Sequence, residues 1–290
     1  MISEINKLPS PRLFVIGDSF SSPPRSGDVT SMWTSILAKK LSNYLGNPTP
    51  VVNGSLHGAS QVWCWGVLQS WLENCITPDD YLVIILTDPG RFWFVEDRPD
   101  LSNSHIIDFD QYISSNVSNA IASYIQYIQR PSIDTIHLID RLGLLAYYVL
   151  NHRLRRPILI KAFEQEVVHA NNFKELNWAN GTLLNVQQSE FKNRADHRTF
   201  WHGLDARYNH LCLCNHEILA NKIFTGVIDD TSIDLTTGFI QDILDNRVLE
   251  DIEFCKKELD MHEIEVTLKE KYLNTPISSW RDRMFTRKGK

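Results

Sequence analysis

The sequence lacks the features that mark membrane, secreted and nucleic-acid-binding proteins. No apolar run approaches the ~20 residues that a membrane-spanning helix needs, and the first residues contain no apolar segment with a small-residue cleavage site. We therefore expect a soluble, cytoplasmic protein without a signal peptide. The net charge is −6 and no basic stripe crosses the chain, so neither nucleic acid nor a membrane is expected as a partner.

Paired cysteine motifs are also missing. The five cysteines are scattered and none forms a Cys-x-x-Cys pair, which argues against a disulfide framework or a structural zinc site. We expect no metal and no organic cofactor. Of the 290 residues, 43% are hydrophobic and 22% are charged, which predicts one large globular domain with an appendage.

The most informative stretch is the apolar run Leu13–Ile16, which is followed directly by Gly17-Asp18-Ser19. Its β-branched and aromatic residues predict a buried strand, and Gly17 permits the turn that ends it. Ser19 then stands at the carboxyl end of a strand, which is the edge where open α/β sheets bind ligands. A hydroxyl in that place, followed by free backbone N–H groups, is well positioned to act as a nucleophile.

Two further strands are predicted to end in polar loops. The first, about residues 50–53, leads to Gly58 just before a tryptophan-rich helix, where the helix dipole favours negative charge. The N–H of Gly58 is a candidate oxyanion donor, and a glycine of an ordinary strand-to-helix turn is the alternative. The second, Tyr81–Leu86, is predicted to be central and buried, and it ends at Thr87 with Arg91 nearby. Because three predicted strands end in polar loops, we expect these loops to form the rim of one active site.

Hydrophobic periodicity predicts the other elements of the fold. Helices are expected over about residues 32–45, 62–75, 108–129 and 132–151, the first ended by Gly46 and Pro48. A fourth parallel strand is expected over residues 157–163. The polar region 164–199 is predicted to form loops with short helices over the carboxyl edge of the sheet.

A histidine in the last third of the chain is the candidate general base. His210 precedes an amphipathic helix, so its imidazole can lie in a loop and reach across to Ser19. His202 is a weaker alternative because it lacks the sequence context of His210. His216 is expected to cap or decorate the helix, and His57 either lines the pocket or is a solvated loop histidine.

Together these motifs resemble the SGNH, or GDSL-type, hydrolase superfamily of esterases and acetylesterases. The resemblance covers about residues 13–224 and rests on Gly17-Asp18-Ser19, on Gly58, and on the pattern Asp-x4-His-Leu-x4-His-x2-Leu-Ala that begins at Asp205. It implies that Ser19 is the nucleophile and His210 the general base. It also implies that the backbone N–H groups of Ser19 and Gly58 bind the oxyanion.

The sequence departs from the family pattern in two places. The family usually has an aspartate three positions before the histidine, where this chain has Arg207; Asp205 is then the candidate to orient His210, and a Ser–His dyad is the alternative. The family's third strand usually ends in Gly-x-Asn, and this chain has no such asparagine. The hydroxyl of Thr87 and the side chain of Arg91 are the candidates to replace it as oxyanion donors.

From these features we predict a three-layer α/β/α fold of the flavodoxin-like, SGNH-hydrolase type over residues 1–226, with a mainly parallel sheet of about five strands. Residues 227–290 are charged with intermittent apolar positions, which predicts a helical C-terminal extension. This extension is the best candidate for an oligomer or assembly contact.

The predicted activity is the hydrolysis of carboxylic esters by a Ser-His(-Asp) site. An O-acetyl group on a carbohydrate is the first substrate expected, and a lipid or small acyl ester is the second. Several tryptophans could stack on sugar rings, with core packing as the default: Trp63, Trp65, Trp71 and Trp93. The alternative is a weakened or inactive binding module of the same fold in a larger assembly such as a phage particle, which would place the protein in a virion.

Overall fold

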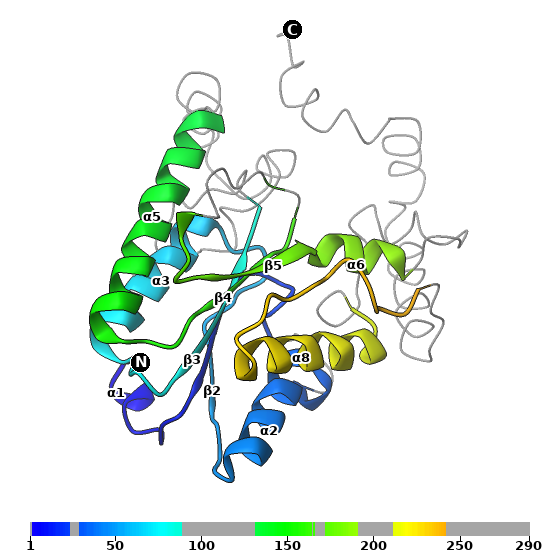
Figure 1. Ribbon diagram of the computed structural model, residues 1–290, viewed down its shortest axis with the longest axis horizontal. Coiled ribbons are helices and arrows are strands. Elements are labelled where there is room, and N and C mark those ends of the chain that lie inside the picture. The colour runs from blue at the N-terminus through cyan, green and yellow to red at the C-terminus, as the bar shows by residue number, and fades with distance from the viewer. Residues whose placement is uncertain are drawn as a thin grey trace, which may run out of the picture.

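The centre of the protein is a five-stranded parallel sheet (Figure 1). The computed structural model describes residues 2–23, 29–88, 131–163, 165, 172–190 and 211–241. The strands are β1 (Leu13–Ile16), β2 (Val51–Asn53), β3 (Tyr81–Leu86), β4 (Ile158–Lys161) and β5 (Asn177–Thr182), in the spatial order β2-β1-β3-β4-β5. This order is that of flavodoxin-like folds, which confirms the predicted fold class.

Helices cover both faces of the sheet, as Figure 1 shows. One face is covered by α2 (Trp33–Leu45) and α8 (Leu213–Ile228), which pack against each other, and the other by α3 (Gln61–Asn74) and α5 (Pro131–His152). Three short helices complete the described elements: α1 (Ile2–Ile5), η1 (Val29–Ser31) and α6 (Leu183–Ser189). The molecule therefore has the three layers that the sequence predicts.

The side chains of β1 divide between two hydrophobic cores. Leu13 and Val15 lie in the core under α2 and α8, whereas Phe14 and Ile16 lie in the core under α3, and all four are fully buried. Because successive strand residues point to opposite faces, a strand between two helical layers must be apolar at every position. This requirement explains the unbroken apolar run that ends at Gly17.

Most predicted elements are confirmed within the described residues. The helix predicted to end at Gly46 does so, and Gly46 adopts the left-handed conformation with φ 71° that is favoured at helix C-termini. The predicted helix over residues 108–129 lies outside the described residues.

The prediction of loops with short helices over residues 164–199 is wrong for β5. This strand is polar, with Asn177, Asn180 and Thr182 among its six residues, and its side chains alternate between buried and more exposed positions. An edge strand needs to bury fewer apolar side chains than a central strand, so it carries little of the hydrophobic signal by which strands are recognised.

The chain after α8 also belongs to the α/β unit. Asn180 donates its N–H to the carbonyl of Ile233 at 2.7 Å and accepts from the N–H of Leu235 at 2.8 Å, so this segment lies along the outer edge of β5. Ile233 and Leu235 are buried in the core under α8. The predicted boundary after residue 226 falls within α8 and leaves Ile233 and Leu235 outside the predicted α/β domain. Residues 242–290 of the predicted extension lie outside the described residues.

A buried ion pair holds the amino-terminal edge of the sheet. Arg12 and Asp80 directly precede the neighbouring strands β1 and β3, and Arg12 Nη2 lies 2.6 Å from Asp80 Oδ2. The guanidinium also donates to the carbonyls of Ile5 and Cys75, and Thr77 donates to Asp80. Burial alone would raise the pKa of Asp80, but the hydrogen bonds from Arg12 and Thr77 outweigh it and lower this pKa below its usual value.

We predict that Asp80→Asn lowers the free energy of unfolding by about 3–5 kcal/mol at pH 7, because Arg12 would remain buried without its counter-charge. Since the pKa of Asp80 is lowered in the folded state, its contribution is complete above about pH 4 and is lost as the pH falls through the folded value. Urea unfolding at several pH values should show the difference from wild type shrinking below about pH 4. Asp79→Asn, at the exposed neighbouring position, is the control, and an equal loss in both variants would contradict the assignment.

Candidate active site

The sheet order places a topological switch point at the carboxyl ends of β1 and β3. The chain moves from β1 to β2 on one side and then returns to β3 on the other side of β1, with α2 and α3 on opposite faces. In open parallel sheets this switch point is where ligands bind. The loops after β1, β2 and β3 carry Ser19, Gly58 and Thr87, so the fold brings these three predicted residues to one edge.

Ser19 lies at the tip of a tight turn. The carbonyl of Asp18 accepts the N–H groups of Ser21 at 3.0 Å and Ser22 at 2.9 Å, and the Asp18 side chain accepts the N–H of Phe20 at 3.1 Å. Ser19 itself is 8% exposed. Within the part of the chain that the structure describes, neither its hydroxyl nor its N–H has a hydrogen-bond partner.

Gly17 is required by space rather than by backbone angle. It is not among the described residues with positive φ, but a Cβ at this position would lie 2.5 Å from Ile85 Cβ and 2.7 Å from Ser21 Oγ. Real Cβ atoms do not approach other atoms so closely. From the sequence, glycine is expected here for its conformational freedom, whereas the structure shows that Gly17 allows the close approach of β3 and Ser21 to the turn.

Hydrogen bonds join the loop after β2 to the Ser19 turn. Ser21 Oγ donates to Ser55 Oγ at 2.9 Å, Asn53 Nδ2 donates to the carbonyl of Ser21 at 2.7 Å, and the N–H of Leu56 donates to the carbonyl of Gly17 at 3.2 Å. These bonds fix the two loops relative to each other.

Gly58 occupies this same loop, three residues before α3. Its φ of 70° is the left-handed conformation that favours glycine. Its N–H, like that of Ser19, has no acceptor among the residues that the structure describes. Two N–H groups that lack an acceptor among the described residues, on adjoining loops at a strand edge, are donors of the kind that an oxyanion hole uses.

Thr87 does not fit its predicted role as an oxyanion donor. Its side chain is fully buried, and its hydroxyl donates to the carbonyl of Ala59 at 2.8 Å. A hydroxyl has a single hydrogen to donate, so in this arrangement it is not available to a substrate. The hydroxyl instead ties the end of β3 to the residue after Gly58. Arg91, the other predicted replacement for asparagine, lies outside the described residues.

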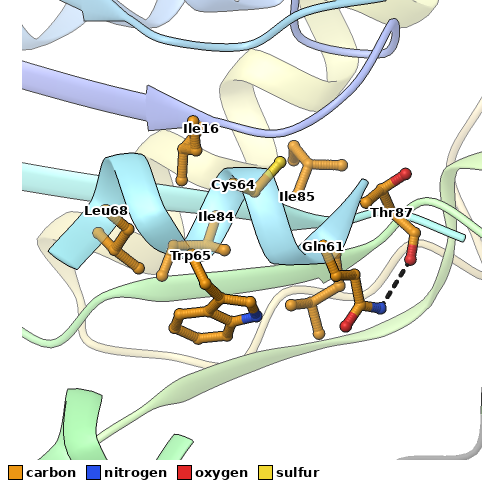
Figure 2. A pocket seen from close by; sticks show the side chains of 9 residues that line it. Ile16, Gln61, Cys64, Trp65, Leu68, Ile84, Ile85 and Thr87 are labelled. Atoms are coloured by element: carbon orange, nitrogen blue, oxygen red, sulfur yellow. Dashed lines mark hydrogen bonds between the residues drawn. The ribbon is translucent and has the colours of Figure 1, made fainter. Parts of the chain in front are cut away.

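A pair of glutamines that the sequence analysis missed also braces this edge. Gln61 Nε2 donates to the carbonyl of Thr87 at 2.8 Å and to Gln165 Oε1 at 2.9 Å, and Figure 2 shows Gln61 beside Thr87. The cavity that Gln61 and Thr87 line with apolar residues of β1, β3 and α3 has a volume of about 10 Å³, which is room for one water molecule at most. No local pattern marks Gln61, because Gln165 is 104 positions away in the chain.

The predicted base and its partner lie outside the described residues: His210, the alternative base His202, and the candidate acid Asp205. Within the described residues, α8 begins at Leu213, shortly after His210. His216 on α8 is fully buried, and its Nδ1 accepts the N–H of Trp33 at 3.4 Å. The Trp33 indole in turn donates to the carbonyl of Phe20 at 2.8 Å. His216 therefore links α8 to α2, which contacts the residue after Ser19.

The other candidate residues that the structure describes are buried, partly buried or next to a backbone carbonyl. Trp65 and Trp71 are buried in the core under α3, in agreement with core packing, and Trp93 lies outside the described residues. His57 Nε2 lies 3.2 Å from the carbonyl of Pro23. Cys212 is buried and Cys214 is partly buried. In the described ranges no group of three or more His, Cys, Asp or Glu side chains is arranged to hold a metal ion.

No protein-family model matches this chain, and no curated protein matches its sequence. Among the described helices, none is long and apolar enough to cross a membrane.

We predict that Thr87→Val lowers the free energy of unfolding by about 1–3 kcal/mol, because the carbonyl of Ala59 would lose its buried donor. Thr49→Val is a matched control, since Thr49 is also buried but its hydroxyl has no hydrogen-bond partner among the described residues. That variant should be neutral or slightly stabilising. Urea unfolding measures the free energy of unfolding of both variants. Equal changes would show that the hydrogen bond between Thr87 and Ala59 contributes nothing to stability.

Proposed function

We propose that the protein is a serine ester hydrolase that removes an acyl group, with O-acetyl on a carbohydrate or a small ester as the substrate class. The observation that supports this proposal most strongly is the arrangement around Ser19. The Ser19 hydroxyl and the N–H groups of Ser19 and Gly58 have no hydrogen-bond partner among the described residues, and they occupy adjoining loops at the switch point of a parallel sheet. The resemblance of the sequence motifs to SGNH hydrolases supports the same chemistry.

In the proposed reaction, Ser19 Oγ attacks the ester carbonyl while His210 takes the hydroxyl proton. The carbonyl oxygen becomes an oxyanion, which accepts hydrogen bonds from the N–H groups of Ser19 and Gly58. The C–O bond to the alcohol breaks, and His210 returns the proton to the leaving alcohol. Water then attacks the acyl-Ser19 ester by the same route and releases the carboxylic acid. Asp205 orients His210, or the site works as a Ser–His dyad.

Thr87 does not supply the third oxyanion donor of SGNH hydrolases, since its hydroxyl donates to the carbonyl of Ala59. Arg91 is the remaining candidate that the sequence offers. Loss of one oxyanion donor costs about 10²–10³ in rate, so the proposed enzyme is expected to be slow on unactivated esters if Arg91 does not serve.

We predict that Ser19→Ala and His210→Ala each lower kcat/KM for p-nitrophenyl acetate by about 10³-fold or more. Ser70→Ala, which removes a partly exposed serine of α3, should retain wild-type turnover and so control for surface reactivity. Acetylated carbohydrates and longer acyl esters then rank the substrate classes. Turnover that survives in Ser19→Ala would reject Ser19 as the nucleophile, and a wild-type protein without turnover would favour a binding module on the same fold.

Gly58 gives a second test of the oxyanion arrangement. Gly58→Ala places a side chain at a φ of 70°, which costs about 1–2 kcal/mol and turns the N–H away. We expect kcat to fall by about 10²-fold. Gly46→Ala is the matched control, because Gly46 has nearly the same φ, 71°, and a Cβ there would meet no atom within 4 Å. It should carry the same strain with an unchanged kcat; equal kcat in the two variants would remove Gly58 from the site.

A further inference from the structure

A buried carboxyl group lies at the start of α8 and has no role in the reaction described so far. Glu190 follows α6 and is fully buried. Its Oε1 accepts the backbone N–H of Cys212 at 2.9 Å and the side-chain Nδ2 of Asn215 at 2.8 Å. Neither sequence periodicity nor the family resemblance points to Glu190, because its partners are more than 20 positions away in the chain.

Asn215 extends this contact to a third segment. It is also fully buried, and it donates to the carbonyl of Ile240 and accepts the N–H of Ile240, both at 2.9 Å. The end of α6, the first turn of α8 and the chain near residue 240 thus meet at Glu190 and Asn215, and Figure 1 shows these segments close together. Burial of a carboxyl group costs free energy unless N–H donors compensate it, and a helix N-terminus adds a favourable dipole. The first turn of α8 is therefore held at a defined place.

The position of that turn matters because of what precedes it. Cys212, whose N–H binds Glu190, is two residues after His210, and two residues of extended chain span about 7 Å at most. The intervening residue, Leu211, is buried in the core under α8. Leu211 and Cys212, the two residues that follow His210 in the sequence, are thus anchored by core packing and by Glu190.

We propose that Glu190 is a positioning residue of the hydrolytic site, which fixes the start of α8 and through it the approach of His210 to Ser19. This inference rests on the proposed function for its catalytic consequence. The family's aspartate before His210 is missing in this chain, and Glu190 contributes to the position of His210 through the backbone of Cys212.

The test compares Glu190→Gln with Glu217→Gln, which alters an exposed glutamate on the same helix. We expect Glu190→Gln to lower kcat for p-nitrophenyl acetate by about 10- to 10²-fold, because small displacements of a catalytic group have effects of that size. KM should change by less than about twofold, since the group does not bind substrate. Glu217→Gln should match wild type in both constants.

A second readout does not depend on turnover. In ¹⁵N-histidine-labelled protein, the imidazole signals of His210 are assigned by their loss in His210→Ala. They should shift in Glu190→Gln and stay unchanged in Glu217→Gln. Asn215→Ala, which removes one donor to Glu190, should shift them in the same direction and replaces Glu190→Gln if that variant does not fold.

The outcomes separate the two proposals. A folded Glu190→Gln with wild-type kcat and unchanged His210 signals overturns the role of Glu190, and lowered thermal stability alone would show a structural cap only. If wild-type protein has no Ser19-dependent turnover, the proposed function fails and the role of Glu190 in a hydrolytic site fails with it, whereas an active wild-type protein with an unaffected Glu190→Gln variant overturns the role of Glu190 alone.

Discussion

The pairing of β1 with β3 determines where the polar residues of the candidate site lie. Leu13 to Ile16 align with Tyr81 to Ile84 in parallel register, so both strands end at the same edge. At that edge the turn after β1 passes so close to β3 that only glycine fits at position 17, with Ile85 Cβ 2.5 Å from where a Cβ would be. The position of Ser19 thus follows from the packing of two central strands.

Different interactions stabilise the two ends of the pair formed by β1 and β3. At the amino-terminal edge, Arg12 forms a buried ion pair with Asp80 and donates hydrogen bonds to the backbone carbonyls of Ile5 and Cys75. At the carboxyl edge, Thr87 and Gln61 use their hydrogen bonds to fix the loop that contains Gly58. The side chains around the site are thus engaged in holding loops, which leaves the N–H groups of Ser19 and Gly58 for a ligand.

The sequence predicted those parts of the molecule that depend on local pattern. The buried run Leu13–Ile16, the glycine that ends α2 and the polar strand ends are confirmed, because burial and turn chemistry show directly in residue type. The polar edge strand β5 was missed because its side chains carry little hydrophobic signal. The roles of Thr87 and Glu190 were missed because hydrogen bonds between distant segments leave no periodicity in the chain.

The central claim is that Ser19 is a nucleophile activated by its surroundings. Mass spectrometry of the protein after reaction with a fluorophosphonate probe tests this claim most directly, because the reagent forms a covalent phosphonyl ester only with activated hydroxyls. The account predicts one adduct, located on Ser19 and lost in His210→Ala although that variant retains the Ser19 hydroxyl. Intact protein without an adduct, or labelling spread over other serines, would contradict it.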